Sequence, residues 1–345
     1  MRVDLALIGF GNVARRFVRL LDEQGQQLAA KERLDYRIVG IATRRHGAMH
    51  QKSGVDAALA VKQVEAGRRL DEIAPATVRT AFDVIAALAT SSAPLRVVIE
   101  TTTLNIENGR PAIDHVEAAL ASGCHVVTAN KAPAAFAYRG LEASAKAAGL
   151  SFLFEGAVMD GVPVFNLVRE TMPTATITGF RGIVNSTTNH ILSALERGEA
   201  FAPALARMQA LGIAEADPSL DVDGWDAAAK AAALANVFME AGLTPHDVLR
   251  EGLGPETAER AIAAKARGQR LRLIASGARG QKPSVALTEL PGDDLLAALS
   301  GQANALILTT DMLDDIAICQ LGGDLRHTAY ALLSDLVTVR RRAGA

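Results

Sequence analysis

Residues 5–14 of the 345-residue chain are LALIGFGNVA, an apolar run that meets two glycines and continues into a helical pattern. The uninterrupted apolar residues from Leu5 to Ile8 indicate a short buried strand. Gly9 and Gly11 mark a turn, and the next apolar residues recur at helical spacing, at Val13, Phe17, Leu20 and Leu21. The stretch therefore predicts a strand, a tight turn and a helix in direct succession.

The order of these three elements also predicts a binding site. Gly9 permits the tight turn, Gly11 lets a pyrophosphate approach the backbone, and Ala14 is small enough for close packing of helix on strand. The N-terminus of the helix then faces the anion. A purely structural glycine turn remains the alternative, but the position at the start of a βαβ pattern favours a dinucleotide.

Strands and helices continue to alternate through the first part of the chain. Further strands are expected at 36–42, 96–100 and 125–128, with a helix at 111–122. This alternation predicts a parallel sheet with helices on both faces. We therefore expect an α/β protein in which residues 1–148 form a Rossmann-type, doubly wound dinucleotide-binding domain.

The pattern changes after about residue 150. Longer strands are expected at 151–154, 176–184 and 283–290, and a helix at 223–241 lies between them. These elements predict a second, α+β domain over residues 149–315. The last helix, within 316–345, is expected to return to the first domain.

Composition limits the classes of function. The chain has 36 Lys and Arg against 38 Asp and Glu, so no basic excess suggests a nucleic-acid or membrane partner. Cys124 and Cys319 cannot by themselves form a disulfide framework or a multi-ligand metal site. The N-terminus lacks the basic, apolar and cleavage regions of a signal peptide, so we expect a cytoplasmic enzyme or binding protein.

The residues after the second strand bear on the choice of cofactor. A preference for NAD usually places an acid here, because a carboxylate holds the ribose 2′-hydroxyl. This chain has Thr43, Arg44 and Arg45 instead, and two guanidinium groups could hold the 2′-phosphate of NADP. The alternative is that both arginines are simply solvated.

Two further segments carry lysines in a setting that suggests chemistry. Lys131 follows Asn130 just past a strand end, where ligands bind in an open parallel sheet, although a surface charge is the plainer interpretation. Asp226 and Lys230 are four apart and share a helix face with Leu234, so the pair is predicted to turn inward. A partly buried lysine can have a lowered pKa and serve in proton transfer. Asp223 is expected to cap this helix.

A third segment, from Glu155 to Pro163, combines glycine, proline and two acids. Glu155 and nearby carbonyl groups could hold a cation or a substrate amine. A turn or a helix cap explains the same residues equally well.

Together these segments resemble homoserine dehydrogenases. The chain has GFGNVAR from residue 9, TANKAP from 128, EGAVMDGVP from 155, GIVNSTTNHIL from 182 and LGIAEADPSLDVDGWDAAAK from 211. Their order and spacing match that family over roughly residues 1 to 340. The resemblance implies reversible reduction of L-aspartate 4-semialdehyde to L-homoserine by NADPH or NADH, in threonine and methionine biosynthesis.

The resemblance also implies roles for individual residues. Lys230 would donate or accept the proton at the substrate oxygen, Lys131 would contact cofactor and substrate and share that work, and Glu215 and Asp226 would bind the substrate amino group. A monovalent cation such as Na⁺ would be held by Glu155, Val158, Asp160 and Val162. The second domain would bind substrate and form a homodimer. The resemblance would place the cofactor against Gly9, Gly11, Asn12, Val13, Thr102, Lys131 and Gly322, to which the residues after the second strand add Arg44 and Arg45.

The chain departs from the family pattern at three places. Ser186 stands where the family has glycine, Asp160 stands where it has a small residue, and Arg326 and His327 follow a turn that is glycine-rich in the family. Two alternatives stay open, the first of them because of these departures. One is a related dehydrogenase of another small amino or hydroxy acid, and the other is a nucleotide-binding protein without catalysis.

Overall fold

Two six-stranded sheets organise the computed structural model, which describes residues 1–74, 77–210 and 217–344. Each sheet is the centre of one unit. Unit 1 takes residues 1–133, 137–165 and the C-terminal segment from Leu325, whereas unit 2 takes 134–136 and 166–324. The chain therefore passes between the units at several points.

The sheet of unit 1 has the strand order β3-β2-β1-β4-β5-β6. All neighbours pair in parallel except β3, which forms an antiparallel hairpin with β2. The order reverses direction at β1, and ligands of such sheets bind beyond the carboxyl ends of the strands at that point. The strands are β1 (Arg2–Ile8), β2 (Asp35–Thr43), β3 (Gly47–His50), β4 (Leu95–Glu100), β5 (His125–Thr128) and β6 (Phe152–Leu153).

Helices connect these strands, as the parallel order requires. They are α1 (Asn12–Glu32), α2 (Ala57–Glu65), α3 (Ala81–Ala89), α4 (Ala112–Ala121), α6 (Tyr138–Ala147) and the C-terminal α13 (Leu325–Arg342), with short 3₁₀ turns η1 (Leu70–Glu72) and η2 (Glu155–Ala157). The predicted Rossmann-type α/β architecture is confirmed.

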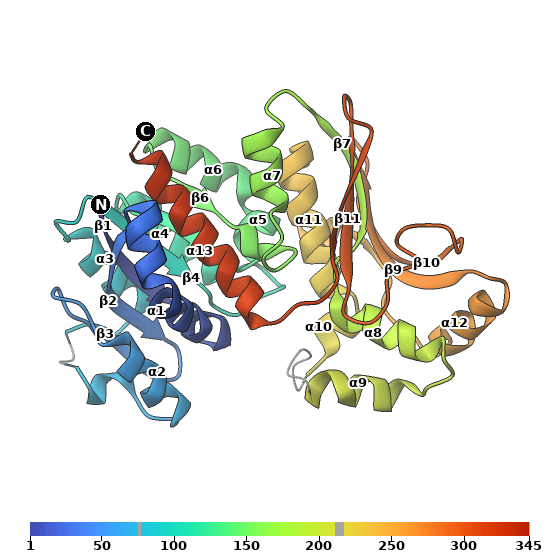
Figure 1. Cartoon of the computed structure of the whole chain (residues 1–345), viewed down its shortest axis with the longest axis horizontal. Coiled ribbons are helices and arrows are strands. Elements are labelled where there is room, and N and C mark those ends of the chain that lie inside the picture. Colours follow the sequence, from blue (N-terminus) through green and yellow to red (C-terminus); the bar gives the residue numbers. More distant parts are fainter. Residues whose placement is uncertain (75–76, 211–216, 345) are drawn as a thin grey trace. The chain divides into compact units, whose positions relative to one another are not determined.

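The C-terminal helix α13 lies beside α1 in Figure 1, where the red helix runs next to the dark blue one. Phe17 and Leu21 of α1 share one buried core with Leu332 and Leu336 of α13. Burying such a side chain stabilises the fold by about 1.5–3 kcal/mol. The last helix is thus part of the core of unit 1, although it follows the whole of unit 2 in the sequence.

The sheet of unit 2 has the order β12-β11-β7-β9-β10-β8 and is antiparallel except for the β10–β8 pair. Its strands are β7 (Ile177–Ile183), β8 (Leu249–Arg250), β9 (Arg270–Ala278), β10 (Ser284–Leu290), β11 (Asn304–Thr310) and β12 (Asp315–Gln320). Its helices are α8 (Ser186–Leu195), α9 (Phe201–Ala210), α10 (Ser219–Val222), α11 (Trp225–Met239) and α12 (Thr257–Ala266), with a 3₁₀ turn η3 (Pro245–Asp247). The chain changes unit within α5 (Ala132–Phe136) and at its end, within α7 (Val164–Thr171), and again between Asp324 and Leu325.

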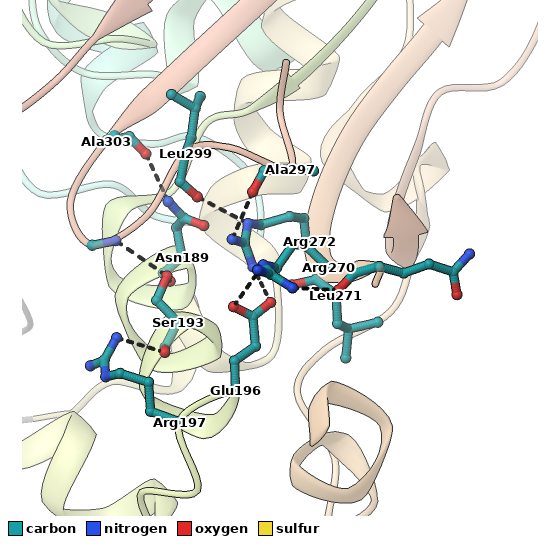
Figure 2. Close-up of polar contacts among 12 residues, drawn as sticks. Asn189, Ser193, Glu196, Arg197, Arg270, Leu271, Arg272, Ala297, Leu299 and Ala303 are labelled. Atoms are coloured by element: carbon teal, nitrogen blue, oxygen red, sulfur yellow. Dashed lines mark hydrogen bonds and ion pairs between the residues drawn. The ribbon is translucent and has the colours of Figure 1, made fainter. Parts of the chain in front are cut away.

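A buried ion pair holds α8 to this sheet. Figure 2 shows Arg272 of β9 donating from Nη1 to Oε1 of Glu196, just after α8, at 2.6 Å. The same guanidinium donates to the carbonyl oxygens of Leu299 and Ala297, so it also fixes the segment before β11. Such a pair is tolerated inside a protein because every polar atom finds partners.

Three expectations differ from the structure. Residues 151–154 were expected to begin the second domain, but β6 is a two-residue strand that pairs with β5 in the first sheet. A short apolar run does not specify which sheet it joins. The division by contacts also differs from the expected boundaries, since residues 149–165 group with unit 1 and 316–324 with unit 2.

Candidate active site

The first glycine of the loop after β1 is required by both conformation and space. Gly9 has φ +86°, and a Cβ atom there would lie 2.6 Å from the carbonyl carbon of Thr101. Its backbone is tied to both neighbouring strands, because its N–H donates to Ala42 and its carbonyl accepts from the Thr101 hydroxyl. This packing closes the turn tightly over the end of the sheet.

The loop then opens at the start of α1. Gly11 is the N-cap residue, no side chain caps the helix there, and a Cβ at Gly11 would meet nothing within 4 Å. Arg15 fixes the turn by donating to the carbonyl oxygen of Phe10 and to the side-chain oxygen of Asn12. The uncapped start of a long helix beside an open glycine fits a dinucleotide pyrophosphate.

The two candidate 2′-phosphate ligands lie on the β2–β3 turn. Arg44 and Arg45 are exposed at its tip. The turn itself is fixed, because the backbone N–H of His46 donates to Oγ1 of Thr43 at 2.6 Å and the His46 ring contacts the carbonyl oxygen of Arg68. Both guanidinium groups are thus presented from a well-braced position at the carboxyl end of β2.

A buried carboxylate organises the ends of β4 and β5. Glu100 is fully buried, and its Oε1 accepts from the backbone N–H and the hydroxyl of Thr102. Its Oε2 accepts from the hydroxyl of Thr128 at 2.7 Å. Burial raises the pKa of the Glu100 carboxyl, and these donors oppose that rise. Glu100 therefore couples the loop of Thr102 to the strand that leads to Lys131.

Asn130 continues this network into the loop that carries Lys131. Its N–H donates to Oγ1 of Thr128, its Nδ2 donates to the carbonyl oxygen of Thr102, and its Oδ1 accepts from the N–H of Ala132. Lys131 lies between two residues that are held in this way, directly before α5. Unit 1 thereby places Thr102 and the Lys131 backbone at the ends of the neighbouring strands β4 and β5.

The second predicted constellation forms in unit 2. Lys230 lies on α11 with its Nζ atom 2.9 Å from Oδ2 of Asp226 and 2.5 Å from the carbonyl oxygen of Val184. The side chains of Lys230 and Asp226 are 13% and 14% exposed, so the predicted inward orientation of the pair is confirmed. An ammonium with fixed acceptors and a small opening to solvent is suited to donating a proton.

Asn185 joins this pair to a second carboxylate. It caps the N-terminus of α8, because its Oδ1 accepts from the N–H of Thr188. Its Nδ2 donates to Oδ1 of Asp221 at 2.7 Å and to Oδ2 of Asp226 at 2.9 Å. One amide thus holds two carboxylates around a single ammonium.

This cluster contains two carboxylates, Asp221 and Asp226, but one ammonium, that of Lys230. Partial burial raises the pKa of the Asp221 carboxyl, and the nearby charge of Asp226 raises it further. Asn185, Lys230 and Thr187 act in the opposite direction. A site with surplus negative charge attracts a second cation, such as the ammonium of an amino acid.

Two further predictions about this segment concern Asp223 and Glu215. Asp223 does not cap α11, because the N-cap residue is Gly224 at φ +79° and no side chain supplies a cap. Asp223 instead ends α10, and its carbonyl oxygen accepts from Arg250. Glu215 falls at a position outside the described residues.

The segment proposed for a cation lies in unit 1. Glu155 is buried, its Oε1 accepts from the N–H of Phe165, and its own N–H donates to Asp335. Asp160 has φ +48°, and its Oδ1 accepts from the hydroxyl of Thr328. The described residues contain no group of three or more His, Cys, Asp or Glu side chains that could hold a metal. A cation here would therefore depend on Glu155 and on backbone carbonyls, including those of Val158 and Val162.

Three remaining observations concern Gly322, the two cysteines and the length and polarity of the helices. Gly322 lies exposed in the short loop between β12 and α13. Cys124 and Cys319 are free thiols, the first buried and the second exposed. Within the described residues, no helix is both long and apolar enough to cross a membrane.

Roles for Glu100, Asn185 and Asp221 were not predicted from the sequence. Glu100 resembles any strand residue in the sequence, and only burial in the middle of three donors shows its role. Asn185 and Asp221 do lie in the quoted motifs, and the capping pattern Asn-x-x-Thr before an apolar run was an available signal for Asn185.

Known proteins share both halves of this arrangement. The family model described as homoserine dehydrogenase, NAD binding domain, matches residues 9–155, and the model described as homoserine dehydrogenase matches residues 163–337. An NAD(+)-dependent homoserine dehydrogenase of Pseudomonas canavaninivorans is 34% identical over 343 residues, covering 98% of this chain and 96% of that protein. The homoserine dehydrogenase of Methanocaldococcus jannaschii is 33% identical over 343 residues, covering 98% of both.

Solved structures agree with these relatives. A hyperthermophilic archaeal homoserine dehydrogenase in complex with NADPH has a TM-score of 0.79 to this chain at 28% identity, covering 98% of each chain. Sequence models, full-length relatives and structure all lead to one family. The chain belongs to the homoserine dehydrogenases.

Proposed function

We propose that this protein interconverts L-aspartate 4-semialdehyde and L-homoserine with a nicotinamide cofactor. The observation that carries the proposal is the cluster of Asp221, Asp226 and Lys230, held by Asn185. It combines a proton donor with surplus negative charge, which are the two features that an amino-acid aldehyde needs for reduction. A nucleotide-binding protein without catalysis would have no use for a largely buried lysine in this setting.

Lys230 is the proposed acid and base. When the nicotinamide is bound, it supplies or accepts the hydride. The Lys230 ammonium stabilises the developing negative charge on the substrate oxygen and donates its proton there, and in the oxidation direction the neutral amine accepts that proton. Asp226 and the Val184 carbonyl hold Nζ in place during both directions.

Asp226 has a second proposed role in binding substrate. Its carboxylate, together with that of Glu215, binds the substrate ammonium and so places the aldehyde end toward Lys230. The geometry of Asp226 supports this, because Asn185 and Lys230 both contact its Oδ2 atom and so fix the orientation of the carboxylate. A substrate without an amino group lacks this contact and is expected to bind more weakly.

Lys131 is proposed to bind both cofactor and substrate and to share the proton transfer. Its placement between Asn130 and Ala132, which are fixed to Thr102 through hydrogen bonds, supports a position at the nicotinamide end of the cofactor. Thr102 would contact the nicotinamide ribose. The pyrophosphate would be held by Gly9, Gly11, Asn12 and Val13, and Gly322 would complete the cofactor contacts.

We propose a preference for NADP because Arg44 and Arg45 are presented from a braced turn at the end of β2. Replacing both by Ala should lower the ratio of kcat/KM for NADP to that for NAD by at least about tenfold to a hundredfold, the effect of losing a single charge-assisted hydrogen bond of about 1.5–3 kcal/mol. Arg139→Ala, at an exposed position of α6, is the control. An unchanged ratio would show that the two arginines are only solvated.

A monovalent cation such as Na⁺ is proposed at Glu155 and the carbonyls of Val158, Asp160 and Val162. The buried Glu155 carboxylate fits a cation, and a cation there would rigidify the loop rather than take part in the reaction. Activity measured in sodium chloride and in choline chloride of equal ionic strength tests the proposal. Equal activity in both salts contradicts it.

We further propose that the protein is a cytoplasmic homodimer that assembles through unit 2. Its sheet ends in the edge strand β12, whose Asp315, Ala317 and Cys319 side chains are exposed. Free thiols at Cys124 and Cys319 fit a reducing compartment. The mass in solution, measured by light scattering, tests the dimer.

A substrate panel tests the reaction itself. L-Homoserine, L-threonine, L-serine and 4-hydroxybutyrate are each incubated with NADP and with NAD, and the absorbance of the reduced cofactor is followed. We expect turnover of L-homoserine above the others, because only it combines the primary alcohol with the ammonium at the right distance. Preference for another compound would identify a related dehydrogenase.

A further inference from the structure

The short helix α5 is shared between the two units. Ala132 and Pro133 group with unit 1, whereas Ala134, Ala135 and Phe136 group with unit 2, and the chain returns to unit 1 at Ala137. Lys131 immediately precedes this helix. The segment that follows Lys131 must therefore be held by side chains of unit 2.

Asn236 of α11 provides the hydrogen bonds that fix this segment. Its Nδ2 donates to the carbonyl oxygens of Ala134 and Ala135, both at 3.1 Å, and to that of Leu243 at 2.9 Å. Its Oδ1 accepts from the N–H of Leu243 at 2.9 Å. Two hydrogens serve three carbonyl oxygens, so one of these bonds is shared, and the amide has no polar atom left without a partner.

The carbonyl groups of Ala134 and Ala135 belong to the last turn of a five-residue helix. Carbonyl groups in that position have no partner within their own helix, so they need an external donor. Asn236 is 5% exposed, and leaving these groups without it would bury them unsatisfied. The side chain therefore works as a cap for α5 that is supplied by another helix.

Contacts between aromatic rings also fix this segment. Phe136 packs edge-on against the ring of His246, with 6.2 Å between ring centroids, and His246 packs in turn against Trp225 at 5.2 Å. Trp225 is the first residue of α11. Asn236 lies near the end of α11, and His246 packs against Trp225 at its start. Asn236 and His246 together form one anchor for residues 134–136.

A second anchor lies on the other side of Lys131. Asn130 is fixed to Thr102 and Thr128 of unit 1, as described above. Only residues 131–133 separate the two anchors. Lys131 therefore lies in the chain between a residue fixed by its own hydrogen bonds, Asn130, and the segment of Ala134 and Ala135 that Asn236 holds.

We propose that Asn236 is a positioning residue for Lys131. This inference rests on the proposed role of Lys131 at cofactor and substrate. Three residues span at most about 11 Å, so fixing Ala134 limits how far the Lys131 backbone can move from α11. Asn236 follows Lys230 by six residues on the same helix, about 9 Å along its axis. Helix α11 therefore carries Lys230 and, through Asn236, holds the segment that follows Lys131.

The test compares the unmodified chain with two variants that each remove hydrogen bonds made near the C-terminal end of α11. Asn236→Ala removes the cap on α5. Arg279→Ala is the matched control, because Arg279 donates to the carbonyl oxygens of Phe238 and Met239 at the end of α11 and makes no bond to residues 134–136. We expect Asn236→Ala to lower kcat for L-homoserine about tenfold to a hundredfold, since small misplacement of a reacting group has effects of that size.

A double-mutant cycle separates positioning from general damage. If Asn236 acts through Lys131, Asn236→Ala should change single-turnover rates by less than about twofold in a Lys131→Ala background. A purely structural role predicts the same loss in both backgrounds. That result, or an equal loss in Arg279→Ala, would overturn the proposal.

Two further measurements test the proposal if Asn236→Ala does not fold, or if L-homoserine is not the substrate. If Asn236→Ala does not fold, His246→Ala replaces it, because this change removes the exposed half of the anchor. A fall in kcat that is absent in the Lys131→Ala background supports the proposal. An unchanged kcat overturns it. Amide hydrogen exchange of residues 132–137 needs no substrate. Faster exchange in Asn236→Ala supports the anchor even if L-homoserine is not turned over, and unchanged exchange contradicts it.

Discussion

Lys230 and Asp226 lie one turn apart on α11, with 2.9 Å between Nζ and Oδ2, and both side chains are largely buried. Removing the carboxylate charge should therefore disturb both the lysine and the substrate ammonium. Asp226→Asn is expected to lower kcat/KM for L-homoserine about tenfold to a hundredfold, as loss of a charge-assisted hydrogen bond does. Asp223→Asn, at the exposed carboxylate three residues earlier, is the control, and equal kinetics in the two variants would exclude a special role for Asp226.

Asp221 should control the acid side of the pH profile. Its pKa is raised above the usual 3.8 by burial and by Asp226, so its charge is lost sooner than that of an ordinary carboxylate as the pH falls. Asp221→Asn resembles the protonated form at every pH. We expect kcat/KM of this variant at neutral pH to match the low value that the unmodified protein reaches in acid, with a flattened acid limb. A variant that keeps the original limb would show that another group titrates there.

The Arg272–Glu196 pair should dominate the stability of unit 2 (Figure 2). Arg272→Met leaves the Glu196 carboxylate buried without Arg272, and Glu196→Leu leaves the guanidinium charge buried without a carboxylate, so each single change should cost about 3–5 kcal/mol in the free energy of unfolding. The double variant Arg272→Met with Glu196→Leu should be more stable than either single one. Urea unfolding of the four proteins checks this, and simple additivity would refute the coupling.

His115 should make the protein sensitive to mild acid. Its ring is buried against Phe82, its Nδ1 has no partner among the described atoms, and burial lowers its pKa below 6.5. The unfolded chain then binds the proton first, so stability is complete above pH 6.5 and falls as the pH drops below that value. His115→Leu should reduce the difference in unfolding free energy between pH 7.5 and 5.5 by up to about 1 kcal/mol. An unchanged difference would place the acid sensitivity elsewhere.

The features that the sequence predicted depend on local spacing. The strand, turn and helix from Leu5 follow from an apolar run, two glycines and a helical period, and the Asp226–Lys230 pair follows from a spacing of four. The position of Lys131 follows from its place at a strand end. In each case the deciding residues are neighbours in the chain.

The features that were missed depend on contacts between distant residues. Asn185 and Asp221 meet across 36 positions, and Asn236 caps α5 from about a hundred positions away. The order of the strands decides such contacts, and no local pattern records it. Asp223 shows the opposite error, since a residue with good capping chemistry was displaced by Gly224, whose left-handed backbone begins α11.

Oxidation of L-homoserine by the Lys230→Ala variant tests the central claim most directly. Purified protein is incubated with L-homoserine and NADP or NAD, and the reduced cofactor is followed by absorbance, with Lys265→Ala of α12 as the control. We predict turnover by the unmodified protein and the control, and a loss of about a hundredfold or more in Lys230→Ala with cofactor binding retained. Unchanged turnover in Lys230→Ala, or no turnover by a folded protein that binds the cofactor, would contradict the proposed mechanism.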